Sequence, residues 1–359
     1  MVATAKRGWI GIDVGTRAIK LAQVERAPHG LRLVDAIVIP RTTTTSSDGP
    51  DGTAPATCRE EVRAALAMSS RFSGRTAACT LSMHWCQAKT LKVPVEDGTA
   101  DRTLIARKME SAGYAEHVDF DFWRTDVVED GDARPTDGVI ALAVSRRNAA
   151  QLAADVSRCG LDCRALDGVP MALTRAVGMV SAADYGRPVA AVDWGFGEAT
   201  LCAISGHTPA YVRRLRGCGF GSVLQAVGGA LGLHVDELET LVSTSPNGRS
   251  AADHAARQEL QRAIPDLARL PLRTVVDELR RTLTFLKNQL PALAPERIWV
   301  FGAGAIWRQA GEFLGSRIDI PVATWRLCDA GIGSVPGLSP PEEILAPAVT
   351  LSALAWSSP

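Results

Sequence analysis

Two aspartates occupy matching positions in two short apolar segments. Asp13 lies in Trp9-Ile-Gly-Ile-Asp-Val-Gly-Thr16, and Asp193 lies in Val189-Ala-Ala-Val-Asp-Trp-Gly-Phe-Gly197. A carboxylate at such a position can hold a cation that bridges phosphate oxygens, and a glycine two residues later lets backbone N–H groups approach an anion closely. We therefore expect Asp13 and Asp193 to face each other across one cleft that binds a metal-nucleotide from both sides.

The elements that must position these aspartates are strands. An apolar run resumes after each Asp-x-Gly, at 19–24 and at 201–204, which predicts a β-hairpin with the carboxylate at its tip. A third strand is expected after each hairpin, at 31–39 and at 210–215, and a helix follows. The order strand, strand, strand, helix thus occurs in both halves of the chain.

Further elements follow from apolar spacing and from turn residues. Residues 41–57, rich in Thr, Ser, Gly, Pro and Asp, are expected to form a loop. A strand at 298–301 runs into a glycine turn and then a helix, which is a usual place for a nucleotide to contact backbone. The other expected helices are 58–70, 100–112, 148–160, 222–231, 235–242, 272–290 and 344–356, and the other strands are 76–83, 86–93 and 138–145.

Composition narrows the classes of function. The 359 residues are enough for two domains, and 39 basic against 39 acidic side chains give no field that would attract nucleic acid. No signal peptide and no apolar segment of about 20 residues is found, so the protein is expected in the cytoplasm without direct membrane insertion. The eight cysteines contain no Cys-x-x-Cys pair, and we expect reduced, mostly buried thiols.

The two aspartate hairpins and the final strand-glycine-helix unit resemble the actin-like ATPase superfamily, whose members carry phosphate 1, phosphate 2 and adenosine motifs in this order. Within it the chain resembles the PilM-like proteins of type IV pilus assembly. The similar segments are 11–20 for the phosphate 1 motif, 138–168 for a small inserted subdomain, 219–241 for a helical segment and 278–285 for a helix beside the base.

This resemblance implies an α/β fold with two ribonuclease-H-like domains around a nucleotide cleft and a small inserted α/β subdomain. The implied boundaries are 1–93 for the first domain, 94–166 for the inserted subdomain, 167–188 for the return to the first domain, 189–343 for the second domain with a helical subdomain at about 216–296, and 344–359 for a terminal helix that packs on the first domain.

The resemblance also implies roles for individual residues. Asp13 or Asp193 would hold Mg²⁺, and Asp193 would be the catalytic residue that orients an attacking water. Glu239, Glu278 and Arg281 match positions that line the nucleoside pocket, although a solvated helix face explains them equally well. The phosphate-binding residues would be Asp13, Gly15, Thr16 and Lys20 on one side and Asp193, Gly195 and Gly197 on the other, with Gly302 and Gly304 beside base and ribose.

Three departures from the family pattern concern the second half of the site. Ala199 stands where a hydroxyl is usual, Val242 where a lysine is usual, and Ala303 where a glycine is usual. Each lost polar contact costs about 1 kcal/mol. We therefore expect weak, Mg²⁺-dependent ATP binding with negligible turnover, and enzymatic activity stays an open question.

The implied function is a cytoplasmic scaffold of a type IV pilus or related secretion machine. It would lie peripheral to the inner membrane by binding the cytoplasmic tail of a PilN-like bitopic protein, with other pilus or secretion platform proteins as partners, and it would be able to form a homo-oligomer. ATP would act as a conformational ligand. The alternatives are a nucleotide-free scaffold like GspL and a small-molecule kinase of the same fold; an FtsA-like division protein would need a terminal amphipathic membrane tag, which 357–359 do not supply.

Overall fold

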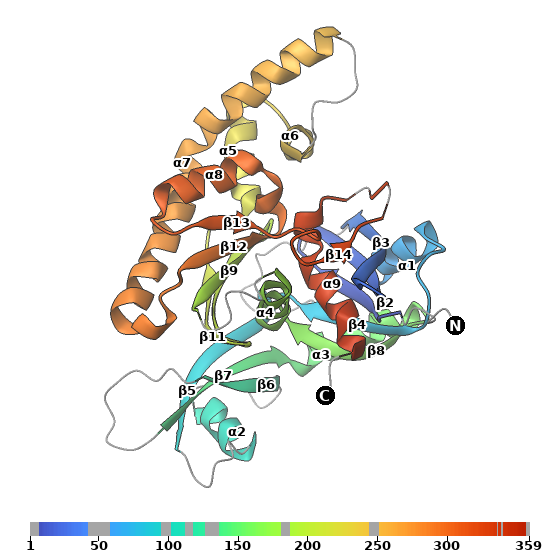
Figure 1. The fold of residues 1–359 in the computed structure, drawn as a ribbon, viewed down its shortest axis with the longest axis vertical. Coiled ribbons are helices and arrows are strands. Elements are labelled where there is room, and N and C mark those ends of the chain that lie inside the picture. The colour runs from blue at the N-terminus through green and yellow to red at the C-terminus, as the bar shows by residue number, and fades with distance from the viewer. Residues whose placement is uncertain are drawn as a thin grey trace.

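The computed structural model describes residues 7–41, 58–94, 102–111, 118–125, 136–180, 187–243, 251–335, 337–338 and 340–356. The loop expected at 41–57 lies, after Arg41, outside the described residues. Three sheets organise the chain, two of them large (Figure 1).

The first large sheet contains the first predicted hairpin. Its strand order is β14 (Ile332–Gly333), β3 (Gly30–Pro40), β2 (Ala18–Ala27), β1 (Ile10–Val14), β4 (Thr76–Leu81) and β8 (Asp162–Gly168). Strands β1, β2 and β3 pair antiparallel, whereas β4 is parallel to β1 and β8 is parallel to β4. The carboxyl ends of β1 and β4 therefore meet at one edge of the sheet, where Asp13 lies.

The second large sheet repeats this topology. Its strand order is β11 (Thr208–Leu215), β10 (Ala199–Ser205), β9 (Val189–Trp194), β12 (Arg297–Phe301) and β13 (Val322–Thr324). Strands β9, β10 and β11 are antiparallel, and β12 and β13 continue in parallel. A helix follows each three-strand unit, α1 (Arg59–Met68) in the first half and α5 (Phe220–Leu231) in the second, as the sequence predicts.

A small third sheet is inserted after β4. Strands β5 (Cys86–Pro94) and β6 (Val118–Thr125) both pair antiparallel with β7 (Thr136–Ser145), and α2 (Arg102–Ser111) packs on them over a small apolar core. The chain then returns to the first sheet through α3 (Arg146–Arg158). Strand β6 was not predicted, although its aspartates and phenylalanines alternate as in a half-buried strand.

One helix joins the two large sheets, and another covers the first of them. α4 (Val169–Val180) contacts β8 of the first large sheet and β9, β10 and β11 of the second. α9 (Ala346–Ala353), between the 3-10 turns η4 (Glu342–Ile344) and η5 (Leu354–Trp356), packs on β1, β2 and β4. A Cβ at Gly11 would lie 1.9 Å from the Ala348 carbonyl oxygen, so this close approach requires glycine in β1.

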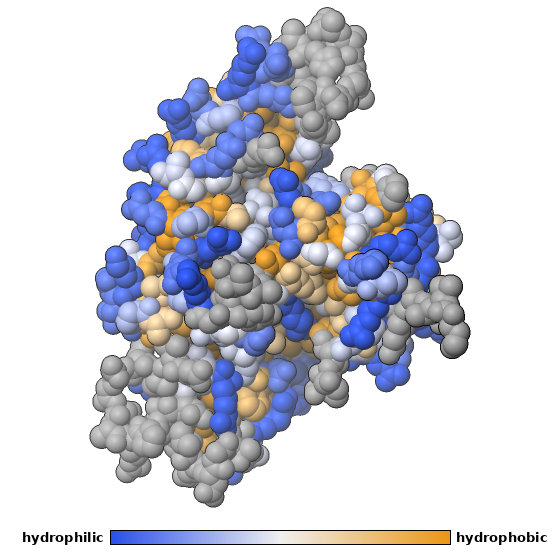
Figure 2. Space-filling model, in the orientation of Figure 1, coloured by the Kyte–Doolittle hydropathy of each residue, from blue (hydrophilic) through white to orange (hydrophobic). Residues whose placement is uncertain are grey.

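The remaining helices pack in the second half of the chain, against its large sheet and against one another. They are α6 (Val235–Ser243), α7 (Ala251–Gln289) and α8 (Arg308–Arg317), with the 3-10 turns η2 (Pro291–Leu293) and η3 (Ala303–Ile306). The predicted apolar stripe of α7 from Leu272 to Leu290 is buried, and hydrophilic side chains cover its outer face (Figure 2). The helix begins at Ala251, whereas the sequence predicted a start at 272. The prediction was late because Pro265 and Pro271 interrupt the helical pattern in the sequence. None of the helices in the described ranges is long and apolar enough to cross a membrane.

Candidate functional site

The two aspartate hairpins have the same register. Asp13 pairs across the hairpin with Lys20, and Asp193 pairs with Thr200. Directly paired residues of an antiparallel ladder project from the same face of the sheet. Each carboxylate therefore shares its face with one polar side chain, which is a cation in the first hairpin and a hydroxyl in the second.

The turns of the two hairpins are also alike. A Cβ at Gly15 would lie 2.9 Å from the Ala18 carbonyl oxygen, and a Cβ at Gly195 would lie 2.9 Å from the Glu198 carbonyl oxygen. Both glycines are thus required by the tight turn itself. The tips approach each other as well, since a Cβ at Gly197 would lie 3.0 Å from the hydroxyl of Thr16.

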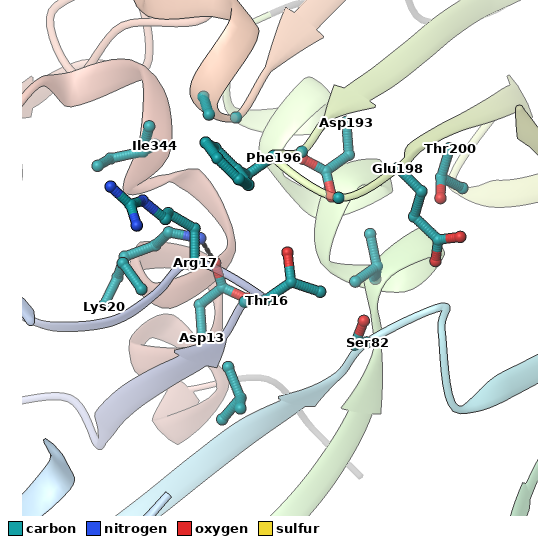
Figure 3. Close-up of a pocket in the computed structure, with 18 of the residues that line it drawn as sticks. Asp13, Thr16, Arg17, Lys20, Ser82, Asp193, Phe196, Glu198, Thr200 and Ile344 are labelled. Atoms are coloured by element: carbon teal, nitrogen blue, oxygen red, sulfur yellow. Dashed lines mark hydrogen bonds and ion pairs between the residues drawn. The ribbon is translucent and has the colours of Figure 1, made fainter. Parts of the chain in front are cut away.

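Both hairpins open onto one cavity of about 120 Å³ (Figure 3). The predicted site residues that line it are Asp13, Gly15, Thr16, Lys20, Asp193, Gly195, Gly197, Glu239 and Gly302. Side chains from the first hairpin point toward those of the second, which is the facing arrangement expected from the repeated motif. The other predicted residues, Gly304, Glu278 and Arg281, do not line this cavity.

The carboxylate of Asp13 is held from both sides. Lys20 Nζ lies 2.7 Å from Asp13 Oδ2, and the Thr80 hydroxyl donates to Asp13 Oδ1 over 2.6 Å. Thr80 is fixed in turn because its hydroxyl accepts from the Val14 N–H at 3.2 Å. Burial opposes the charge of Lys20, but Asp13 and the more distant Asp193 outweigh it and raise the pKa of the ammonium above its usual range.

The carboxylate of Asp193 has no such support. Among the described residues, no side chain or backbone N–H donates a hydrogen bond to it. Burial, together with the charges of Asp13 and Glu198, raises the pKa of Asp193 to about 6, against the opposing effect of Lys20. Of the acidic groups in this cavity, Asp193 is therefore the one whose unfavourable charge a bound cation would relieve most.

Two neighbours of Asp193 complete that side of the cavity. Glu198 pairs with Arg214 at 2.7 Å, and its Oε1 atom is buried with no partner in the described part of the chain. Ala199 faces the apolar core, whereas the next residue, Thr200, lines the cavity because side chains alternate along a strand. The family pattern predicts a hydroxyl at the position of Ala199, and Thr200 supplies one at the next position.

The glycine turn after β12 lies against the second hairpin. Gly302 has φ of 84°, and a Cβ there would lie 2.6 Å from Asp193 Oδ1. Its neighbour Ala303 lines the cavity. Gly304 is packed differently, since a Cβ there would lie 2.2 Å from the ring of Trp194. The structure therefore explains Gly304 by packing, and its role beside a base stays a prediction.

The predicted nucleoside residues divide between two places. Glu239, on α6, lines the cavity and accepts from Arg17 Nη2 at 3.1 Å. Glu278, on α7, pairs instead with Arg213 at 2.8 Å and with Arg281. The pair with Arg213 joins strand β11 to α7, and both pairs lie outside the cavity.

Several lining or supporting residues had no role in the sequence analysis. Thr80 reaches Asp13 from the neighbouring parallel strand, and Arg17 reaches α6 from the first hairpin tip. The Phe196 ring lies under the Arg17 guanidinium, and its centroid is 5.1 Å from Arg17 Cζ. Arg17 and Phe196 could have been predicted as site residues, because they lie within the two hairpin tips. Nothing near Thr80 in the sequence linked it to Asp13.

The residues present fit a Mg²⁺-phosphate group. Mg²⁺ is usually held by one or two carboxylates together with substrate phosphates and water, as Asp13 and Asp193 would allow. A cage made of protein ligands alone is not found, since no cluster of three or more His, Cys, Asp or Glu in the described residues could hold a metal. Asp13, Asp193, Glu198 and Glu239 outnumber Lys20 and Arg17 in the lining, so a free anion is disfavoured unless a cation accompanies it.

No protein-family model matches the sequence, and no curated protein is similar to it in sequence. Among solved structures, the fold is similar to that in the PilM-PilN type IV pilus biogenesis complex, with a TM-score of 0.74 and 20% identity over 98% of this chain and 99% of that chain. It is also similar to the ethanolamine utilization protein EutJ from Carboxydothermus hydrogenoformans, with a TM-score of 0.53 and 15% identity over 96% and 89% of the two chains. The predicted actin-like ATPase fold is confirmed.

Proposed function

We propose that this protein is an actin-like scaffold of a type IV pilus or a related secretion machine, that it acts in the cytoplasm, and that it binds the cytoplasmic tail of a bitopic inner-membrane partner. The observation that carries the proposal is the similarity, over nearly the full length of both chains, to a chain of the PilM-PilN type IV pilus biogenesis complex. Mg-ATP is a weak conformational ligand of the cavity between the hairpins.

A groove beside the small sheet supports the tail-binding proposal. Its volume is about 280 Å³, and it lies between β6 and β7 of the small sheet and β8 and α4 of the larger unit. The apolar and aromatic lining residues are Leu81, Cys86, Phe120, Trp123, Leu142, Ala143, Val144, Ala149, Leu166 and Met171. An extended peptide with alternate apolar side chains suits such a groove.

The charges at the groove suggest the sign of the charge on the tail. Asp119, Asp121 and Asp167 line it, and their ion-pair partners are arginines on the protein itself. The side chains of Asp119 and Asp121 are 57% and 87% exposed, so they remain accessible to a basic residue of the peptide. We expect the tail to combine apolar anchors with at least one lysine or arginine.

A peptide titration tests this function. Labelled peptides that copy the cytoplasmic tails of bitopic proteins encoded beside this gene are titrated with the full chain, with fluorescence anisotropy as the readout. Met171→Glu places a charge in the groove and should weaken binding at least tenfold. Met68→Glu is the matched control, because Met68 is 68% exposed and does not line the groove. Equal binding by both variants, with unchanged thermal unfolding, would contradict the groove assignment.

Calorimetry tests the nucleotide part separately. Mg-ATP at millimolar concentration should give weak, Mg²⁺-dependent heat that Asp13→Ala abolishes. No heat from the wild-type chain would favour a nucleotide-free scaffold. Tail binding would be unaffected by that outcome, so the two parts of the proposal fail independently.

A further inference from the structure

Arg17 connects the two halves of the molecule across the mouth of the cavity. It lies at the tip of the first hairpin, and its guanidinium reaches α6, which belongs to the second half. Nε and Nη2 donate to Glu239 Oε2 at 3.3 and 3.1 Å, and Nη2 also pairs with Asp236. The three groups form one ion-pair cluster with a single cation.

The second hairpin also holds Arg17. The guanidinium lies over the Phe196 ring, 5.1 Å from its centroid. That ring is fixed, because a Cβ at Gly221 would lie 2.6 Å from it and the Gly221 N–H donates to the Phe196 carbonyl at 2.8 Å. Arg17 therefore contacts two separate elements of the opposite half, α6 and the β9–β10 turn.

The cavity behind Arg17 is small for a nucleotide. It measures about 120 Å³, whereas sites for drug-sized ligands occupy roughly 300–1,000 Å³. Admission of a nucleotide requires the two hairpins to move apart, and the contacts of Arg17 join the parts that must separate. Glu239 both pairs with Arg17 and lines the cavity, so a bound nucleoside would compete with Arg17 for it.

We propose that Arg17 is a latch that holds the cleft closed, and that nucleotide binding requires its release from Asp236 and Glu239. This inference rests on the proposed nucleotide site. Because the ligand binds only the unlatched form, its apparent affinity is reduced by the fraction of molecules that are latched. The ion pairs are partly exposed, with 31% of the Arg17 side chain accessible, so the latch is weak enough for a ligand to open.

Asp236 offers a clean perturbation. It contacts Arg17 but does not line the cavity, so Asp236→Asn weakens the latch without altering the proposed nucleotide contacts. Glu237→Gln is the matched control. Glu237 lies in the same first turn of α6 and carries the same charge, but it accepts from the His234 N–H and does not contact Arg17.

Hydrogen exchange without nucleotide tests the latch directly. Residues 15–18, across the cleft from the substitution, should exchange about two- to fivefold faster in Asp236→Asn than in wild type, and Glu237→Gln should match wild type. The difference should disappear at high salt, which screens exposed ion pairs. Equal exchange at 15–18 in the two variants would overturn the latch, whether or not the chain binds ATP.

Mg-ATP calorimetry then tests the link to the ligand. Asp236→Asn should bind about two- to fivefold more tightly than wild type and Glu237→Gln. Weaker binding by Asp236→Asn would overturn the proposal, because the latch would then belong to the ligand-bound form. Absence of heat from all three proteins would refute the nucleotide site and the release step, while exchange at 15–18 would still report whether Arg17 closes the cleft.

Discussion

Asp193→Asn should stabilise the folded protein in a pH-dependent way. The pKa of Asp193 rises from its ordinary 3.8 to about 6 because the carboxylate is buried and faces Asp13 and Glu198. A group whose folded-state pKa is raised binds its proton more tightly in the folded state. The contribution of Asp193 to stability is therefore most favourable below pH 4 and is lost as the pH rises through about 6. The asparagine variant has no charge to lose, so it should escape this decrease.

The size of the effect follows from the shift. A rise from 3.8 to about 6, at 1.36 kcal/mol per unit, corresponds to an upper limit of about 3 kcal/mol at neutral pH. The side chain is only half-buried and borders the cavity, so water screens part of this cost. We expect a gain of about 1.5–3 kcal/mol, or roughly 2–4 °C in Tm for a chain of this size.

Thermal unfolding of the two proteins between pH 4 and pH 8, without divalent cations, measures this effect. The Tm difference should be near zero at the acidic end and should grow to its plateau above about pH 7. Asp13→Asn is the matched control with the opposite sign, because it removes the partner of Lys20. A Tm difference that is the same at both ends of the pH range, or a less stable Asp193→Asn at neutral pH, would refute the electrostatic argument.

Three substitutions test how the site is supported, each by thermal or urea unfolding. Thr80→Val leaves the Asp13 carboxylate and a backbone N–H without the hydroxyl and should cost about 2–3 kcal/mol; an unchanged midpoint would count against this support. Gly11→Ala should cost about 3 kcal/mol, since its Cβ would overlap a carbonyl of α9, whereas Gly229→Ala in α5 meets nothing within 4 Å and should be neutral or stabilising. Lys20→Met should cost about 3–5 kcal/mol by leaving Asp13 unpaired, and adding Asp13→Asn should recover part of it; a double variant less stable than Lys20→Met would contradict the pairing.

The fold was predictable where local pattern and topology agree. The two hairpins follow from apolar runs on either side of a glycine turn, and their repetition predicted the duplicated three-strand units. The segment at 162–180 was harder, because β8 carries Asp162, Arg164 and Asp167 at partly exposed positions and therefore lacks an apolar run. The first part of α7 was missed for a similar reason, since its prolines are helix breakers in sequence and its stripe is clear only after Leu272.

The sequence predicted the parts of the site that the two hairpins themselves supply. Asp13 and Asp193 meet in one cavity because the repeated strand order brings each tip to the corresponding edge of its own sheet, and the two tips line the same cavity. The support from Thr80 and the latch of Arg17 depend on contacts between residues far apart in the chain, which no local spacing encodes. Thr200 shows the limit of comparison by position, because strand alternation and not alignment decides which hydroxyl enters the cavity.

The two aspartates have different surroundings, so a bound cation would affect them differently. Both lie at the same register position, but Asp13 accepts from Lys20 and Thr80, whereas Asp193 has Thr200 and the Gly302 turn beside it and a raised pKa. A cation that enters between them relieves little at Asp13, whose charge is already balanced, and much at Asp193. A bound cation would therefore act mainly on the second hairpin. Because that hairpin also carries the ring on which Arg17 rests, the charge at Asp193 and the closure of the cleft are linked through one short turn.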